Sequence, residues 1–150
     1  MAVSLLTGCS STDVIDGSLA TYEISGSWQC EGLGDPLIEL SYHDHVVYKD
    51  NGSFQKLSKI NFRFPGSNEF NEVEVSSNGT WKKSRNSLTE NNLQFTVEVD
   101  DKFPKAYLEQ FKTQMAIPEQ ASWSLKFLSK NNVLKESVYG QKITCKKALQ

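Results

Sequence analysis

The sequence predicts an all-β fold, an antiparallel meander of about eight or nine short strands with one short helix inserted late in the chain. Three observations lead to this prediction. Apolar and polar residues alternate along most of the chain after residue 21, as in strands that bury one face. Pairs typical of turns, such as Asn-Gly and Asn-Asn, separate these segments at short intervals. A single stretch, residues 104–115, instead spaces its apolar residues as a helix does.

The first half of the domain is expected to hold strands joined by tight turns. The alternating segments are 22–30, 38–48, 54–64 and 70–76. Asn51-Gly52 suits a hairpin turn with positive φ between the second and third segments. Pro65-Gly66 interrupts the pattern before residue 70, and we expect Asn78-Gly79 to form another turn.

The second half repeats this organisation around the helix. Strands are expected around Trp81 and Leu88 and over 93–99, 123–127, 133–139 and 143–145, with a turn at Arg85-Asn86. The predicted helix spans Pro104 to Met115, with Pro104 in its first turn and Pro118 just past its end. Its apolar side carries Tyr107, Leu108, Phe111 and Met115. A lone helix in a β meander is expected to cover an apolar opening. The alternative is an element that binds a partner or gates an opening.

The N-terminal motif Leu6-Thr7-Gly8-Cys9, followed by Ser10, resembles a bacterial lipobox. The resemblance implies that residues 1–8 are a signal peptide removed by a dedicated peptidase and that Cys9 is acylated. Residues 1–5 are short for an apolar segment and carry no Lys or Arg, so we expect the natural signal peptide to start further upstream. The alternative is a cytoplasmic strand in which Cys9 is a small buried thiol.

The rest of the chain divides into a polar tether, residues 9–21, and one domain, residues 22–150. No other apolar run approaches the ~20 residues of a membrane-spanning helix, so attachment is expected through lipid on Cys9. Ser10, in place of Asp, resembles the pattern of outer-membrane sorting in Gram-negative cells. The expected location is therefore the bacterial cell envelope, lipid-anchored to the outer membrane and facing the periplasm. In a Gram-positive cell the plasma membrane would hold the anchor.

With Cys9 lipidated, Cys30 and Cys145 remain near the start and the end of the domain. An oxidising envelope would let them form a disulfide. Two separate buried thiols are the alternative.

Short motifs resemble those of lipocalin-like bacterial domains. They are Gly26-Ser27-Trp28, Asp50-Asn51-Gly52-Ser53-Phe54, and Asn78-Gly79-Thr80-Trp81 followed by Asn86-Ser87-Leu88. The resemblance implies an antiparallel up-and-down barrel or half-barrel with Trp28 closing its floor. In such a barrel, Cys30 and Cys145 would bridge the first and last strands. The chain departs from the family in its long segment 100–120 and in lacking a terminal helix, which favours a plugged interior.

Composition and motifs do not point to an enzyme. The formal net charge is −2, without the basic surplus of nucleic-acid-binding proteins, and no catalytic or cofactor signature follows Cys9. The first hypothesis is an envelope lipoprotein that binds a small apolar or amphipathic ligand inside its barrel. The expected lining residues are Tyr22, Trp28, Tyr42, Tyr48, Phe62 and Phe95. The alternative is a solid-core protein, structural or interacting, that acts through an envelope partner, and the scarcity of small inward residues favours a solid or nearly solid barrel.

His43 and His45 are the only weak metal-ligand candidates. They share the outward face of one strand, and no further ligand is in view, so solvated surface groups are the better interpretation. Asp44 between them falls on the inward face, which indicates either a bulge or a buried polar contact.

Overall fold

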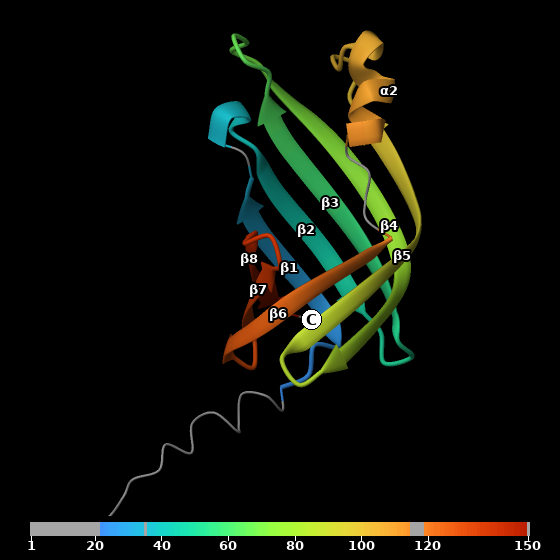
Figure 1. Ribbon diagram of the computed structural model, residues 1–150, viewed down its shortest axis with the longest axis vertical. Helices are drawn as coiled ribbons and strands as arrows, with labels where there is room; N and C mark the ends of the chain where they lie inside the picture. Colours follow the sequence, from blue (N-terminus) through green and yellow to red (C-terminus); the bar gives the residue numbers. More distant parts are fainter. Residues whose placement is uncertain (1–21, 35, 115–118, 150) are drawn as a thin grey trace, which may run out of the picture.

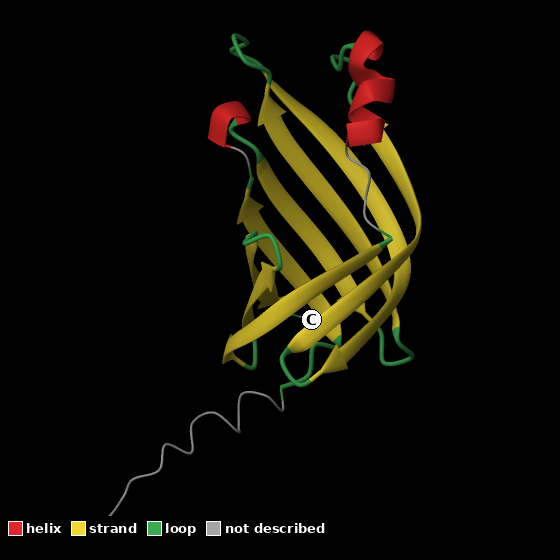
Figure 2. Ribbon diagram, viewed as in Figure 1, coloured by secondary structure: helices red, strands yellow, loops and turns green. Residues whose placement is uncertain are grey.

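The computed structural model describes residues 22–34, 36–114 and 119–149. Over these residues eight antiparallel strands form one closed barrel in sequence order, with β8 pairing back to β1 (Figures 1 and 2). The strands are β1 Gly26–Leu33, β2 Ser41–Tyr48, β3 Ser53–Arg63, β4 Phe70–Ser84, β5 Ser87–Val99, β6 Gln120–Ser129, β7 Asn132–Ser137 and β8 Lys142–Lys147. A short 3-10 helix η1, Pro36–Ile38, follows β1, and helix α2, Lys105–Gln114, follows β5. The predicted all-β barrel with one inserted short helix is confirmed.

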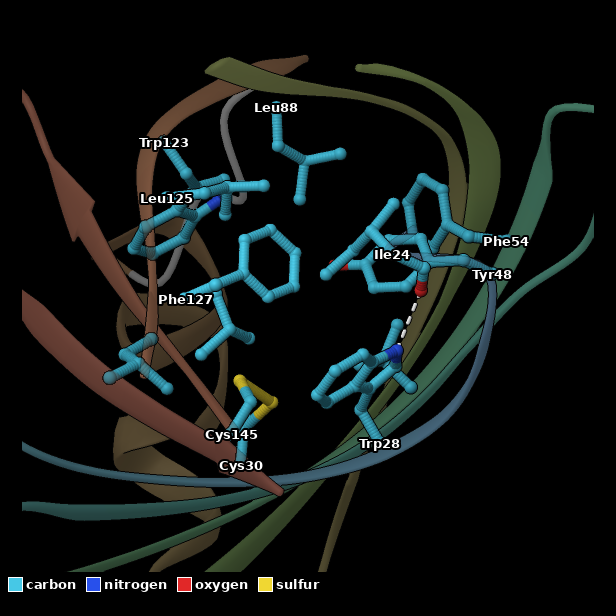
Figure 3. Packing of buried hydrophobic residues seen from close by; sticks show 13 residues of the cluster. Ile24, Trp28, Cys30, Tyr48, Phe54, Leu88, Trp123, Leu125, Phe127 and Cys145 are labelled. Atoms are coloured by element: carbon cyan, nitrogen blue, oxygen red, sulfur yellow. Dashed lines mark hydrogen bonds between the residues drawn. A yellow bond between two sulfur atoms is a disulfide. The ribbon is translucent and has the colours of Figure 1, made fainter. Parts of the chain in front are cut away.

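The barrel interior holds two apolar clusters. The lower cluster lies toward the start of β1 and is shown in Figure 3. Its members are Ile24, Trp28, Cys30, Val46, Tyr48, Phe54, Leu88, Trp123, Leu125, Phe127, Val133, Ile143 and Cys145. The upper cluster lies toward α2 and consists of Ile60, Phe62, Val73, Val75 and Phe103. Alternate residues of each strand supply these side chains, as the period of two predicts.

Two turns form as their sequences predict. Gly52 has a φ of 82° in the β2–β3 hairpin, where the Lys49 amide donates to the Ser53 carbonyl at 2.8 Å. Arg85 has a φ of 54° in the turn between β4 and β5. Both positions need the left-handed backbone that these tight hairpins require.

The turn expected at Asn78-Gly79 is wrong, because β4 runs straight through these residues. A register shift between β4 and β5 occurs here, where Asn78 faces Gln94 and Gly79 faces Asn92. A Cβ on Gly79 would lie 1.8 Å from the Asn91 carbonyl oxygen. The glycine therefore permits close backbone approach at a β-bulge and does not reverse the chain.

Several strand boundaries also differ from the expectation: β6 begins at Gln120 and not at Trp123, and the strands expected around Leu88 and over 93–99 form the single strand β5. The first strand begins at Gly26 and not at Tyr22, and Ile38 lies in η1. Strand β7 ends at Ser137, so Tyr139 lies in a turn, 95% exposed. Pairing with neighbouring strands sets these limits, whereas the apolar alternation continues beyond them.

Helix α2 covers the upper end of the barrel, as expected. Leu108 and Phe111 pack against the upper cluster, and the Phe111 ring stacks on Phe62 with centroids 5.4 Å apart. Phe103, just before the helix, is buried in the same cluster. Met115 and Pro118 lie outside the described residues, as do the predicted signal peptide, Cys9 and the tether. Within the described residues no helix has the length and apolar character needed to span a membrane.

Candidate functional site

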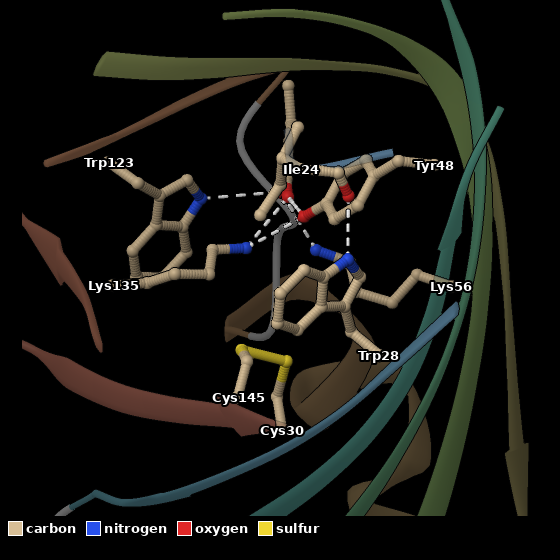
Figure 4. Close-up of a disulfide and its surroundings, with 9 residues drawn as sticks. Ile24, Trp28, Cys30, Tyr48, Lys56, Trp123, Lys135 and Cys145 are labelled. Carbon is tan, nitrogen blue, oxygen red and sulfur yellow. Dashed lines mark hydrogen bonds and ion pairs between the residues drawn. A yellow bond between two sulfur atoms is a disulfide. The ribbon is translucent and has the colours of Figure 1, made fainter. Parts of the chain in front are cut away.

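A disulfide closes the seam of the barrel. Cys30 on β1 and Cys145 on β8 lie directly opposite each other and are bonded, and both are buried (Figure 4). The bond crosses a sequence separation of 115 residues. It therefore fixes the first strand to the last at the side of the lower cluster, as the lipocalin resemblance implied.

Above this seam lies a largely buried group of polar side chains that we call the charge cluster: Tyr48, Lys56, Glu90, Trp123 and Lys135, of which Lys56 is partly exposed. Glu90 is fully buried at its centre. Its Oε1 accepts hydrogen bonds from the Tyr48 hydroxyl and from Lys135 Nζ, the latter at 2.9 Å. Its Oε2 accepts from Lys56 Nζ at 3.0 Å and from Trp123 Nε1 at 3.3 Å.

Five different strands supply the charge cluster, one residue each from β2, β3, β5, β6 and β7. Figure 4 shows the side chains of Tyr48, Lys56, Trp123 and Lys135 converging inside the barrel. Lys135 Nζ also donates to the Tyr48 hydroxyl at 2.9 Å and lies 4.6 Å from the centroid of the Trp123 ring. The cluster thus joins opposite walls of the barrel through one carboxylate.

The environment shifts the pKa values of these groups in different directions. Burial alone would raise the pKa of Glu90, but Lys135, Lys56 and the Tyr48 hydroxyl together hold it well below its usual range. Burial lowers the pKa of Lys135 despite the attraction of Glu90. Burial also tends to lower the pKa of Lys56, but the negative charges of Glu90 and Asp44 outweigh this effect and raise it. Burial and the Glu90 carboxylate raise the pKa of Tyr48.

Asp44 adds a second carboxylate near the charge cluster. It pairs in unbroken register with Cys30 and Ser58, so it does not mark a bulge. Its Oδ1 atom is buried and has no hydrogen-bond partner among the described residues. The charge of Asp44 nevertheless acts on both lysines: it contributes to the raised pKa of Lys56 and partly opposes the lowering of the Lys135 pKa by burial. A buried oxygen that accepts no hydrogen bond costs free energy, so a bound molecule that donates a hydrogen bond to Asp44 Oδ1 would be favoured here.

The six predicted ligand-lining residues do not form one wall. Trp28 and Tyr48 belong to the lower cluster and Tyr22 packs against it, whereas Phe62 belongs to the upper cluster, with Tyr42 against it. Phe95 is 46% exposed. Whether these residues bind a ligand stays a prediction.

The two histidines lie on the outer face of β2, where alternation placed them. Both are exposed. His45 Nε2 lies 2.7 Å from the Ser27 hydroxyl, and His43 Nδ1 lies 3.9 Å from a Glu31 carboxylate oxygen. No set of three metal-ligating side chains is found in the described part of the chain.

Sequence reasoning missed the charge cluster, although a signal for it exists. Glu90 follows buried Leu88 by two residues, and Lys135 follows buried Val133 by two. Lys56 stands in the same relation to buried Phe54. Charged residues at inward positions of an alternating strand indicate a buried ion pair, but the sequence does not reveal that the three lie together.

Comparison with known protein families gives a match over most of the chain. The family model described as "Trans-membrane regulatory protein ToxS" matches residues 17–143. No curated protein matches the chain.

Proposed function

Because the chain belongs to the ToxS family of trans-membrane regulatory proteins, we propose that it is a non-enzymatic regulator of the bacterial cell envelope that acts through a protein partner. The observation that carries this proposal is the filled lower half of the barrel. Trp28, Tyr48, Phe54 and Leu88 are all at most 2% exposed there, and their side chains occupy the space in which a lipocalin-like barrel would hold a ligand. A filled core favours function on the outer surface.

The charge cluster supports a structural role for the interior. Each carboxylate oxygen of Glu90 accepts two hydrogen bonds, and Lys56 and Lys135 both donate to it. Groups so fully engaged and removed from water are poor nucleophiles or proton carriers for an external substrate. The cluster instead fixes the relative positions of five strands, so that a surface formed by those strands keeps one shape.

A strain that lacks the chain tests the regulatory role. We expect its transcript profile to differ from that of the same strain carrying the chain on a plasmid, measured by transcript sequencing under envelope stress. A Phe70→Ser variant, changed at an exposed apolar residue of the β4 end, serves as a control for expression. Indistinguishable transcript profiles with and without the chain would refute a regulatory role.

Asp44 favours a second candidate function, the binding of a small amphipathic ligand in the upper half of the barrel. A ligand hydroxyl or amine could donate to the orphan Oδ1 atom, while its apolar body packs against the upper cluster. Native mass spectrometry of the chain purified from its own envelope would detect such a ligand as a bound mass of roughly a few hundred daltons. Loss of this species in Asp44→Ala, but not in His43→Ala, is the expected result.

Membrane attachment through lipid on Cys9 is a further part of the proposal. The lipobox-like residues 6–9 support it, whereas the family description names a trans-membrane protein and says nothing of a lipid. Metabolic labelling with a palmitate analogue should mark the wild-type chain and not Cys9→Ser. Equal labelling of both would exclude Cys9 as the acylated residue.

A further inference from the structure

Basic side chains gather at one end of the barrel, which we call the lower rim. An up-and-down barrel places alternate connections at the same end, and Figure 1 shows the β2–β3, β4–β5 and β6–β7 hairpins together where the chain enters β1. With the two chain ends, the lower rim comprises residues 22–26, 49–52, 82–87, 129–132 and 146–149. Its basic residues are Lys49, Lys82, Lys83, Arg85, Lys130, Lys146 and Lys147, and its acidic residues are Glu23 and Asp50. The rim therefore has a surplus of positive side chains, although the formal net charge of the chain is −2.

The fold does not neutralise the cations of the lower rim. At the opposite end of the barrel, Arg63 and Lys112 form ion pairs with acidic side chains. Lys82, Arg85 and Lys146 are exposed, and none of them forms an ion pair with a described residue. Like charges collected at one end repel each other, so an anionic surface placed against the lower rim would be attracted to it.

Two lysines of the lower rim lie across the mouth of the barrel. Lys83 Nζ lies 6.0 Å from the centroid of the Phe127 ring, and Lys147 Nζ lies 5.3 Å from the centroid of the Trp28 ring. Both lysines are half-buried. A lysine that packs its aliphatic stem on apolar side chains directs its ammonium group toward a polar surface. The lower cluster is thus bordered by positive charge at this end.

The lower rim also contains an open groove of about 300 Å³. Its lining residues are Gly26, Ser27, Asn131, Lys147, Ala148 and Leu149. Lys147 supplies an ammonium group, and Ser27 and Asn131 supply polar side chains. Leu149 is 97% exposed, so an apolar side chain borders the same groove. A cation with polar neighbours suits a phosphate group, and the adjacent apolar side chain suits the start of an acyl chain.

The chain enters the barrel from the lower rim. Tyr22 packs against the lower cluster and Ile24 is buried in it, before β1 begins at Gly26. The 21 residues that precede Tyr22 therefore join the barrel at this end. Any membrane attachment N-terminal to Tyr22, through a lipid or a spanning segment, would hold the lower rim beside the bilayer and not the end that α2 covers.

We propose that the lower rim docks on an anionic bilayer surface and that the groove beside Lys147 receives the phosphate of one anionic phospholipid. The inference goes beyond the proposed regulatory function and requires neither a protein partner nor acylation of Cys9. The attraction of several Lys and Arg side chains to an anionic surface adds up, and salt screens it. Docking at this rim orients the barrel so that α2 lies at the end far from the bilayer.

Vesicle flotation tests the docking. The full chain carrying Cys9→Ser, which removes the candidate acylation residue, is mixed with vesicles of phosphatidylcholine alone or of phosphatidylcholine with phosphatidylglycerol. We expect about tenfold more chain to float with the vesicles that contain phosphatidylglycerol, and high salt to abolish the difference. Equal flotation with both kinds of vesicle would overturn the docking, because apolar contacts alone would then explain the binding.

Charge reversal assigns the binding to the lower rim. The triple variant Lys82→Glu, Arg85→Glu and Lys146→Glu should float about tenfold less with phosphatidylglycerol than the parent chain. The matched control changes three exposed lysines elsewhere by the same total charge: Lys102→Glu, Lys105→Glu and Lys142→Glu. It should float much more than the rim variant. Equal losses in the two triple variants would overturn the rim as the docking surface, and so would no loss in the rim variant. Thermal unfolding of each variant verifies that the barrel still folds.

A second pair of variants tests the groove. Lys147→Met keeps the stem over Trp28 but removes the charge, and we expect it to lower flotation more than Lys49→Met, at an exposed rim position outside the groove. Equal effects would overturn the phosphate site in the groove. The transcript profile is a separate measurement. A chain that docks as expected but leaves that profile unchanged would remove the proposed function and retain this inference.

Discussion

At the residue scale, the fully buried carboxylate of Glu90 is the feature that most constrains the barrel. It neutralises two lysines that would otherwise bring positive charge into an apolar interior. Removing one partner of a buried ion pair costs more stability than the intact pair contributes, because the remaining charge is then buried without a counter-charge. The effect of changing Glu90 should therefore exceed that of any surface carboxylate.

Replacing Glu90 by glutamine should lower the free energy of unfolding by about 3 kcal/mol, since Lys56 and Lys135 would lose the carboxylate that contacts both and only the more distant Asp44 would remain to compensate them. Urea titration followed by tryptophan fluorescence measures the change. Glu72→Gln, at an exposed position of β4, is the control and should change stability by less than about 0.5 kcal/mol. Equal effects of the two variants would show that the charge cluster does not stabilise the barrel.

The pH dependence of stability provides a second test at this residue. The folded-state pKa of Glu90 lies well below its unfolded value, so the folded state holds fewer protons than the unfolded state at mildly acidic pH. Its stabilising contribution is complete above the unfolded pKa and is lost as pH falls from about 5 toward the folded pKa. Thermal midpoints measured from pH 7 to pH 3 should fall less steeply for Glu90→Gln than for wild type. Parallel curves would contradict the assignment.

At the element scale, helix α2 and the β4–β5 bulge show how tertiary contacts modify what local sequence predicts. The helix forms where the apolar spacing and Pro104 predict it. Its contact with an open barrel end is expected because it is a lone helix in a β meander. The Asn78-Gly79 pair has the local character of a turn, yet it continues a strand because the Asn91 carbonyl needs the space beside Gly79. Such a contact between residues 12 apart along the chain leaves no local signal.

Phe111→Ala should loosen the cover of the upper cluster. The substitution removes a ring stacked on Phe62 and in edge contact with Phe103, and we expect a loss of about 2 kcal/mol, seen as a lower thermal midpoint. Lys112→Ala, on an exposed side chain of the same helix, controls for helix propensity. An unchanged midpoint together with unchanged partner or ligand binding would refute the covering role.

Gly79→Ala should disrupt the bulge, because its Cβ would collide with the Asn91 backbone. The expected loss is on the order of 3 kcal/mol, measured by urea unfolding. Gly66→Ala, whose Cβ would meet no atom within 4 Å, tests the separate effect of a positive φ and should be milder. A Gly79→Ala chain as stable as wild type would mean that the two strands can separate locally at no cost.

At the scale of the whole molecule, the sequence permits prediction of the barrel, its disulfide and its helix, because alternation, cysteine number and helical spacing are local signals. The charge cluster could not be predicted in the same way. Lys56 and Lys135 meet Glu90 only because β3, β5 and β7 face one interior.

Loss of the seam disulfide should destabilise the whole barrel. Cys30→Ser with Cys145→Ser removes a link across 115 residues and should cost about 2–5 kcal/mol, seen as a lower urea midpoint. Because both sulfurs are buried, reductant should act on the folded wild-type chain only as fast as the seam opens. A double variant with the wild-type midpoint would show that β1 and β8 hold the seam through their hydrogen bonds alone.

Native mass spectrometry of the chain, released from its own membranes in mild detergent, tests the central claim most directly. The account predicts a complex of this chain with one other protein. A wild-type chain that always appears without a protein partner, whether bare or carrying a small molecule, would contradict the account.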